Sequence, residues 1–206
     1  MEGVLKKLST LFPFLQGFIN KMIISQWKRR GTPVPSPHAV KQETIKAYAK
    51  TFHTNVLIET GTYLGDMMEA QKRHFTKLYS IELSEQLWER ATGRFKSNPA
   101  INILQGDSGK VLHQLMPTIN EPCLFWLDGH YSAGITALGE KECPVFEELD
   151  AIMQHSLSHV ILIDDARLFI GKNDYPTIAE LSEYLKNCTK NYTMSVSEDI
   201  IRIIPA

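Results

Sequence analysis

The sequence predicts a doubly wound α/β domain whose mostly parallel, seven-stranded sheet ends in an antiparallel hairpin. First, short apolar runs alternate with longer amphipathic stretches from residue 38 onward, as in parallel strands connected by helices. Second, the central runs are apolar on both faces, so helices should cover the sheet on both sides. Third, the last two runs, 192–197 and 200–205, are separated by Glu198 and Asp199 alone. That gap is too short for a helix, so these runs must pair as a hairpin.

Each element follows from this pattern in order. The stretch 31–37 contains three prolines and reads as a linker, because proline cannot sit inside a continuous helix. A helix near the middle of the chain should begin close to Pro144. We expect strands at 55–59, 77–82, 101–105, 123–128 and 159–164, and helices at 38–52, 65–75, 84–95, 108–116, 142–156 and 176–187.

The composition is that of an ordinary globular protein. The 206 residues carry a formal net charge of -1, with 43% hydrophobic and 22% charged residues, unlike a disordered chain. The balanced charge gives no general attraction to nucleic acid, so no such partner is expected. The three cysteines form neither a C-x-x-C pair nor a zinc-type spacing, which indicates reduced thiols in a cytoplasmic protein. We expect one domain, residues 38–206, preceded by a helix and linker at residues 1–37.

Residues 1–30 form a segment of their own. Apolar residues recur there at helical spacing, and Lys28, Arg29 and Arg30 follow them. The longest uncharged run, 8–20, is too short to cross a bilayer. We expect a helix that packs on the domain or on a second subunit in a homodimer. Peripheral contact with a membrane surface through residues 1–30 is the alternative.

The segment after the first strand, ETGTYLGD at 59–66, has the features of a ligand-binding loop. In a doubly wound sheet, ligands bind at the carboxyl ends of the strands where the strand order reverses. Gly61 permits a tight turn and a close backbone approach, and Gly65 opens the next helix. The spacing E-x-G-x-x-x-G differs from the G-x-G-x-x-G of dinucleotide loops, and Glu59 would repel a pyrophosphate. The loop therefore favours a cationic ligand, and its candidate contacts are Glu59, Thr60, Gly61, Thr62, Tyr63, Gly65 and Asp66.

The next two strand ends suit a nucleoside. Glu82 ends the second strand, where its carboxylate can accept hydrogen bonds from both ribose hydroxyls. Asp107 follows the third strand and can accept from an adenine amino group, while the backbone N–H of Ser108 faces a ring nitrogen. Asp107 and Ser108 also suit a helix N-cap, and the two roles can coexist.

The fourth and fifth strands end in carboxylates. Asp128 follows one, and Asp164 and Asp165 follow the other. Neighbouring strands would bring all three together, where they need a cation, and oxygen ligands suit Mg²⁺, Ca²⁺ or Mn²⁺. In the alternative interpretation, Asp128 positions ligands while Asp164 and Asp165 cap a loop. His130 is a candidate general base, or else a loop histidine that holds the backbone or contacts the cofactor.

The motifs ETGTYLG, SIE, QGDSG and FWLDGHYSAG, each following a strand, resemble the class I S-adenosylmethionine-dependent methyltransferases, a Rossmann-like family, over roughly residues 54–204. Tyr63 departs from that pattern, because it stands at the middle glycine of the commoner three-glycine loop. The D-G-x and D-D motifs are similar to those of the cation-dependent, macrocin-type sugar O-methyltransferases. That resemblance implies ligation of Mg²⁺ or another divalent cation by Asp128, Asp164 and Asp165. His130 stands where the antibiotic enzymes tend to carry an acid.

The expected function is therefore S-adenosylmethionine-dependent methylation of a small-molecule or sugar hydroxyl. Asp128 and His130 would be catalytic, and a metal would lower the pKa of the hydroxyl and orient it. Three alternatives stay open. One is an NAD-dependent oxidoreductase, against which the loop spacing and the terminal hairpin argue. Another is a non-catalytic, nucleoside-binding protein of the same fold. The last is a metal-dependent hydrolase that uses the same aspartates and His130.

Overall fold

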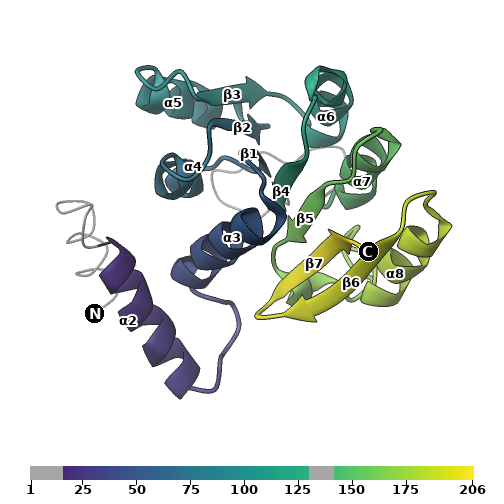
Figure 1. Ribbon diagram of the computed structural model, residues 1–206, viewed down its shortest axis with the longest axis horizontal. Coiled ribbons are helices and arrows are strands. Elements are labelled where there is room, and N and C mark those ends of the chain that lie inside the picture. The colour runs from purple at the N-terminus through teal and green to yellow at the C-terminus, as the bar shows by residue number, and fades with distance from the viewer. Residues whose placement is uncertain (1–15, 130–141) are drawn as a thin grey trace.

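The computed structural model describes residues 16–129 and 142–206, which form a seven-stranded sheet covered by helices on both faces (Figure 1). The order of the strands is β3-β2-β1-β4-β5-β7-β6. The first five are parallel to one another, and β7 is antiparallel to both β5 and β6. The predicted fold class is thereby confirmed. The strands are β1 (Val56–Thr60), β2 (Lys77–Glu82), β3 (Ile101–Gln105), β4 (Cys123–Leu127), β5 (Val160–Ile163), β6 (Tyr192–Ser197) and β7 (Ile200–Pro205).

Two hydrophobic cores lie on opposite faces of the sheet. Alternate residues of a strand point to opposite faces, so Ile58 of β1 packs in one core and Leu57 in the other. The Ile58 core contains the buried faces of α6 (Ser108–Leu115), α7 (Val145–Gln154) and α8 (Ile178–Asn187). The Leu57 core contains those of α3 (His38–Phe52), α4 (Asp66–Gln71) and α5 (Glu85–Phe95).

The strand order reverses beside β1, and this reversal positions the candidate site. From β1 the chain adds strands toward β3 on one side and then returns to place β4 on the other side. Hydrogen bonding between neighbours continues past the strand ends, from Asp128 N to Thr60 O (3.1 Å) and from Asp164 N to Leu127 O (3.0 Å). The alternation of faces continues with it. Glu59 and Asp164 therefore lie on the same face of the sheet as the residues that pack against α3 and α4.

The predicted helices are all present, and two of them are shorter than expected by more than two residues. The helix expected at 65–75 ends at Gln71, and the one expected at 142–156 covers Val145–Gln154. Phe75 lies beyond the end of α4 and is buried in the core. An apolar residue that continues a helical pattern can thus belong to a loop packed under the sheet.

The first described helix, α2 (Gln16–Arg29), packs on α3 through a polar contact. The side chain of Asn20 is buried, and its Nδ2 donates to Gln42 Oε1 at 2.9 Å and to Glu43 Oε1 at 3.1 Å. Phe18 and Met22 remain exposed on the same helix. Packing on the domain is therefore observed for residues 16–29. Contacts of residues 1–30 with a second subunit or a membrane stay predictions, and residues 1–15 lie outside the described chain. Across the described ranges, no helix combines the length and apolar character that crossing a membrane requires.

The terminal hairpin turns on two residues in the left-handed region. Glu198 has φ 55° and Asp199 has φ 61°, the positive φ values that a type I′ turn requires, although neither is the glycine or asparagine that such turns favour. Arg202, 6% exposed, supports the turn by donating to Glu198 Oε2 at 2.9 Å and to the carbonyl oxygen of Ile200 at 3.2 Å. Ser36 Oγ donates to Glu198 O at 2.6 Å, which attaches the linker before α3 to this turn.

Two histidines connect the start of β4 to the start of β5 through a chain of hydrogen bonds. His159, fully buried, accepts from the backbone N–H of Cys123 at Nδ1 (3.0 Å), so its Nε2 must carry the proton. That Nε2 contacts His155 Nδ1 at 2.8 Å, and His155 Nε2 contacts the carbonyl oxygen of Ile119 at 3.1 Å. These hydrogen bonds can all form only when both imidazole rings are neutral. Burial, together with the nearby His155 and Lys190, lowers the pKa of His159 from 6.5 to about 3.

We expect this histidine chain to make the protein acid-sensitive. Between pH 6.5 and about 3 the unfolded state binds a proton at His159 that the folded state does not. The free energy of unfolding should therefore rise with pH across this window and fall as pH drops, by up to roughly 1.4 kcal/mol per pH unit. Urea unfolding at several pH values measures this slope. His159→Gln should reduce the slope, whereas His113→Gln, on the exposed face of α6, should leave it unchanged. Equal slopes in the wild type and His159→Gln would refute this assignment.

Candidate functional site

The loop between β1 and α4 is held against its two neighbouring strands. The backbone N–H groups of Gly61 and Thr62 both donate to the carbonyl oxygen of Ile81, at 2.9 and 3.3 Å. Gly61 has φ 82°, and a methyl group on its Cα would lie 2.3 Å from the backbone oxygen of Asp128. The close approach predicted at Gly61 is therefore an approach to the end of β4. This contact closes the β1 loop over the point where the strand order reverses.

Tyr63, the residue that departs from the three-glycine pattern, has a left-handed backbone conformation. Its φ is 49°, in the left-handed region, and its side chain is 47% exposed. The tyrosine side chain therefore extends into solvent, while the backbone N–H of Tyr63 stays bonded to Glu82.

Glu82 fixes the loop from the end of β2. Its Oε2 accepts from the backbone N–H of Tyr63 at 2.8 Å, and its Oε1 accepts from that of Ser84 at 2.9 Å. The carboxylate is buried, with 5% of the residue exposed. A carboxylate oxygen has two acceptor positions, so each oxygen of Glu82 keeps one for a ligand. Asp66, also predicted as a contact, lies in the first turn of α4 and pairs with Arg94 at 3.0 Å.

Glu59 lies inside β1 and is 2% exposed. Its carboxyl group accepts a hydrogen bond from the Ser80 hydroxyl, and the hydroxyls of Ser80 and Thr62 lie 2.7 Å apart. Burial raises the pKa of Glu59 well above its usual value; the bond from Ser80 opposes this rise, and the nearby charges of Asp128 and Glu82 add to it. The structure thus places Glu59, Thr60, Thr62 and Glu82 around one loop, with Glu59 in an environment that disfavours its own negative charge.

The β3 end lies beside Glu82. The backbone N–H of Gly106 donates to the carbonyl oxygen of Glu82 at 2.9 Å. Asp107 is the N-cap of α6 and accepts from Lys110 N at 3.4 Å, and Ser108 begins the helix with 8% exposure. The capping role is observed. It leaves acceptor positions on Asp107 for a ligand.

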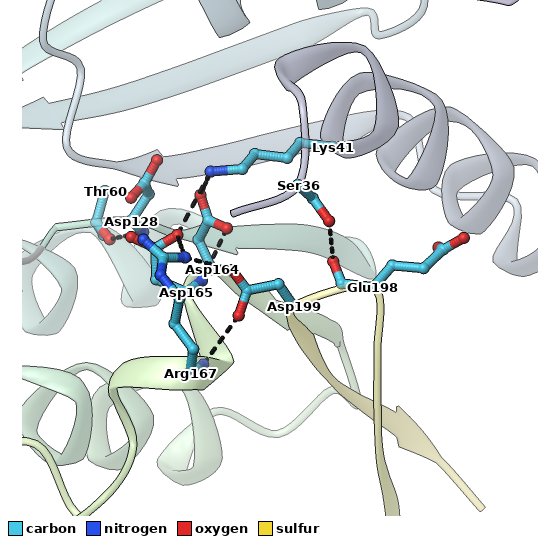
Figure 2. A network of polar contacts seen from close by, with 9 residues as sticks. All are labelled: Ser36, Lys41, Thr60, Asp128, Asp164, Asp165, Arg167, Glu198 and Asp199. Carbon is cyan, nitrogen blue, oxygen red and sulfur yellow. Dashed lines mark hydrogen bonds and ion pairs between the residues drawn. The ribbon is translucent and has the colours of Figure 1, made fainter. Parts of the chain in front are cut away.

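Asp164 lies at the end of β5, fully buried, with a lysine beside it (Figure 2). It accepts from the ammonium group of Lys41, on α3, and from the backbone N–H of Asp165 at 2.8 Å. Lys41 Nζ also lies 3.6 Å from Asp165 Oδ1. Burial alone would lower the pKa of Lys41, but Asp164, Asp128 and Asp165 together raise it above its usual value. Lys41 is therefore a permanent cation at this edge of the sheet.

A second cation approaches the same edge from the opposite direction. Arg167 donates to Asp165 Oδ1 at 2.6 Å and to the carboxylate of Asp199 in the hairpin turn (Figure 2). Its backbone N–H donates to the other oxygen of Asp199 at 2.9 Å. Asp165 itself has φ 57°. Lys41 and Arg167 thus bracket Asp165 and connect α3, the loop after β5 and the terminal hairpin.

The predicted metal ligands, Asp128, Asp164 and Asp165, lie at the ends of β4 and β5. Among the residues at 16–129 and 142–206, no group of three or more His, Cys, Asp or Glu side chains is placed to hold a metal ion. Asp164 and Asp165 instead contact Lys41 and Arg167. In the described structure, the partners of Asp164 and Asp165 are therefore an ammonium and a guanidinium group. His130, the predicted base, lies outside the described chain.

Sequence reasoning missed Lys41 and Asp199. Lys41 stands four residues before Ile45, a core residue with no exposed surface. Residues four apart share a helix face, so this spacing was the signal that Lys41 points toward the sheet. Asp199 was recognised only as a turn residue. Its positive φ was implied by the two-residue turn, but its contact with Arg167 depends on the packing of distant segments.

Comparison with known proteins supports the fold. No family model matches the chain, and no curated protein matches it in sequence. Among solved structures, the SAH-bound methyltransferase PaMTH1 of Podospora anserina has a TM-score of 0.59 at 14% identity, covering 89% of this chain and 87% of that one. An O-methyltransferase of Bacillus cereus in complex with SAH has a TM-score of 0.58 at 11% identity, covering 97% and 99%. The O-methyltransferase TomG of Streptomyces achromogenes, in complex with SAM, has a TM-score of 0.57 at 14% identity, covering 91% and 89%. The chain therefore has the Rossmann-like fold of these methyltransferases.

We expect a side chain at Gly61 to destabilise the protein. Gly61→Ala would place its methyl group 2.3 Å from the Asp128 backbone oxygen and would impose a left-handed φ on alanine. The combined cost should be about 2–4 kcal/mol of unfolding free energy. Gly93→Ala is the matched control, because nothing lies within 4 Å of its added methyl group and its helix is exposed there. That change should stabilise the protein by about 0.5–1 kcal/mol. Denaturant unfolding compares the two variants, and equal stabilities would contradict the close approach.

Proposed function

We propose that the chain is an S-adenosylmethionine-dependent O-methyltransferase that acts on a hydroxyl group of a small molecule or sugar. The observation that carries the proposal is the Glu82 carboxylate, which is fixed by the backbone of the glycine loop and still has one acceptor position on each oxygen. Two acceptors held side by side at the end of β2 suit the vicinal hydroxyls of a ribose. The solved neighbours with bound SAH or SAM support the same assignment.

Glu59 supports a cationic ligand rather than a pyrophosphate. Its buried carboxyl group has a raised pKa and no described cationic side chain in its hydrogen bonds. An ammonium or sulfonium group brought to this loop would stabilise the carboxylate form, so binding would release a proton from Glu59. A pyrophosphate would have the opposite effect, because its negative charge would raise the pKa of Glu59 further. Thr62 and Ser80 orient the Glu59 carboxyl group through their hydroxyls.

The acceptor belongs at the ends of β4 and β5. When bound, S-adenosylmethionine supplies an electrophilic methyl group that an acceptor oxygen can attack in line. Asp128 follows β4 beside the glycine loop, in a position to hold the acceptor hydroxyl or accept its proton. His130, two residues further along, is the second proposed base. Asp164 and Asp165, which follow the neighbouring strand β5, are paired with Lys41 and Arg167. Membership of the macrocin-type subgroup, a homodimer, membrane contact through residues 1–30 and a cytoplasmic location are further proposals.

We expect S-adenosylhomocysteine to bind and to depend on Glu82. Glu82→Gln replaces one acceptor oxygen by an amide group that must face the backbone N–H of Tyr63 or Ser84. The loop should loosen and the affinity should fall by about tenfold or more, roughly 1.4 kcal/mol. Glu89→Gln, on the exposed side of α5, is the matched control and should bind as the wild type does. Isothermal titration calorimetry measures both. Binding of NAD in preference to S-adenosylhomocysteine would favour an oxidoreductase and refute the proposal.

We expect methyl transfer to hydroxyl compounds. Release of S-adenosylhomocysteine should be detected with one or more members of a panel of sugars and phenols, and Asp128→Asn should lower kcat by about a hundredfold or more if Asp128 accepts the proton. His130→Ala separates the two proposed bases, because only the true base should show this loss. Tight nucleoside binding without turnover of any acceptor would instead identify a non-catalytic nucleoside-binding protein.

A further inference from the structure

Three carboxylates at one sheet edge require positive charge, and the chain provides it from a helix. Asp164 has no exposed surface, and its Oδ2 accepts from Lys41 Nζ. Its Oδ1 accepts from the Asp165 backbone N–H at 2.8 Å. Both carboxylate oxygens thus have a partner within the protein. A divalent ion that used Asp164 as a ligand would have to displace the ammonium group first.

Lys41 reaches Asp164 because of the geometry of the fold. Asp164 lies on the face of the sheet that is covered by α3, and Ile45 of α3 packs against that same face. Lys41 lies one turn before Ile45, so its side chain extends toward the carboxyl ends of the strands. Lys41 is 15% exposed at its side chain, against 70% for Lys186 at the end of α8. The Lys41 side chain is therefore packed against the carboxyl ends of the strands and does not extend freely into solvent.

We propose that Lys41 is the resident cation of the site: its ammonium group takes the position that a divalent ion would need at Asp164 and Asp165, so the protein holds its acceptor without a divalent cation. The statement that the acceptor is held without a divalent cation rests on the proposed function, whereas the position of the Lys41 ammonium group does not. Arg167 completes the charge balance by pairing with Asp165 and Asp199. The cation-dependent chemistry suggested by the D-D motif is thereby replaced by an internal lysine.

The proposal is tested by asking when the aspartates bind a metal. Mn²⁺ is titrated into each folded protein, and the free ion is followed by electron paramagnetic resonance. The wild type and Lys41→Arg should show no site at Asp164. Lys41→Met, of similar length but neutral, should gain Mn²⁺ affinity by about tenfold or more over the wild type. The double variant Lys41→Met, Asp164→Asn should lose this gain. Lys46→Met, on the same helix and paired with Glu43, is the matched control and should behave as the wild type.

Two outcomes overturn the proposal. One is Mn²⁺ binding by the wild type that Asp164→Asn abolishes, because the aspartates would then hold a metal in the presence of Lys41. The other is a folded Lys41→Met protein that gains no metal binding. If Lys41→Met does not fold, Lys41→Gln is used instead. The titration of the wild type tests the proposal without any variant. Turnover of the wild type should also be unchanged by a chelator. Failure to bind S-adenosylhomocysteine would refute the proposed function and leave the Mn²⁺ result to decide the role of Lys41.

Discussion

The structure at the carboxyl ends of the central strands depends on the neutralisation of buried negative charge. Asp164 and Asp199 are almost entirely excluded from solvent at their side chains, and an isolated carboxylate in such a place would cost several kcal/mol. Lys41 and Arg167 offset part of that cost, although burial and the nearby Asp128 still raise the pKa of Asp164 well above its usual value. Because these cations come from α3 and from the loop after β5, compensating the charge also fixes where those segments lie. The terminal hairpin is fixed in the same way, through Asp199.

Half of the eight non-glycine residues with positive φ in the described chain lie around the carboxyl ends of these strands and the terminal hairpin. Tyr63, Asp165, Glu198 and Asp199 all have positive φ without being glycine. Each such residue costs of order 1–3 kcal/mol and persists only when surrounding contacts hold it. Those contacts are visible here, from Glu82 to the Tyr63 N–H and from Arg167 to Asp165 and Asp199. The strained residues are thus held by hydrogen bonds and ion pairs that also shape the candidate site.

The sequence predicted the fold well because the signals for it are local. Alternation of apolar runs predicts the parallel strands, and the two-residue gap at Glu198 and Asp199 predicts the hairpin. Residues that end strands, such as Glu59, Glu82 and Asp164, could be placed at one edge from strand order alone. For Lys41 the sequence offers only its four-residue spacing from Ile45, which indicates the side that faces the sheet, whereas its contact with Asp164 depends on how α3 packs there. The metal prediction from Asp128, Asp164 and Asp165 was made from the carboxylates alone, without the ammonium group that the packing of α3 brings to Asp164 and near Asp165.

The helical turn that carries Lys41 faces two neighbours at once. Gln42 and Glu43 follow it directly and accept the bonds from Asn20 of α2, while Lys41 reaches the opposite way to Asp164. A displacement of α2 along α3 would therefore break the bonds of Asn20 to the two residues that directly follow Lys41. The described part of the N-terminal segment and the lysine that pairs with Asp164 are thus anchored on one turn of one helix.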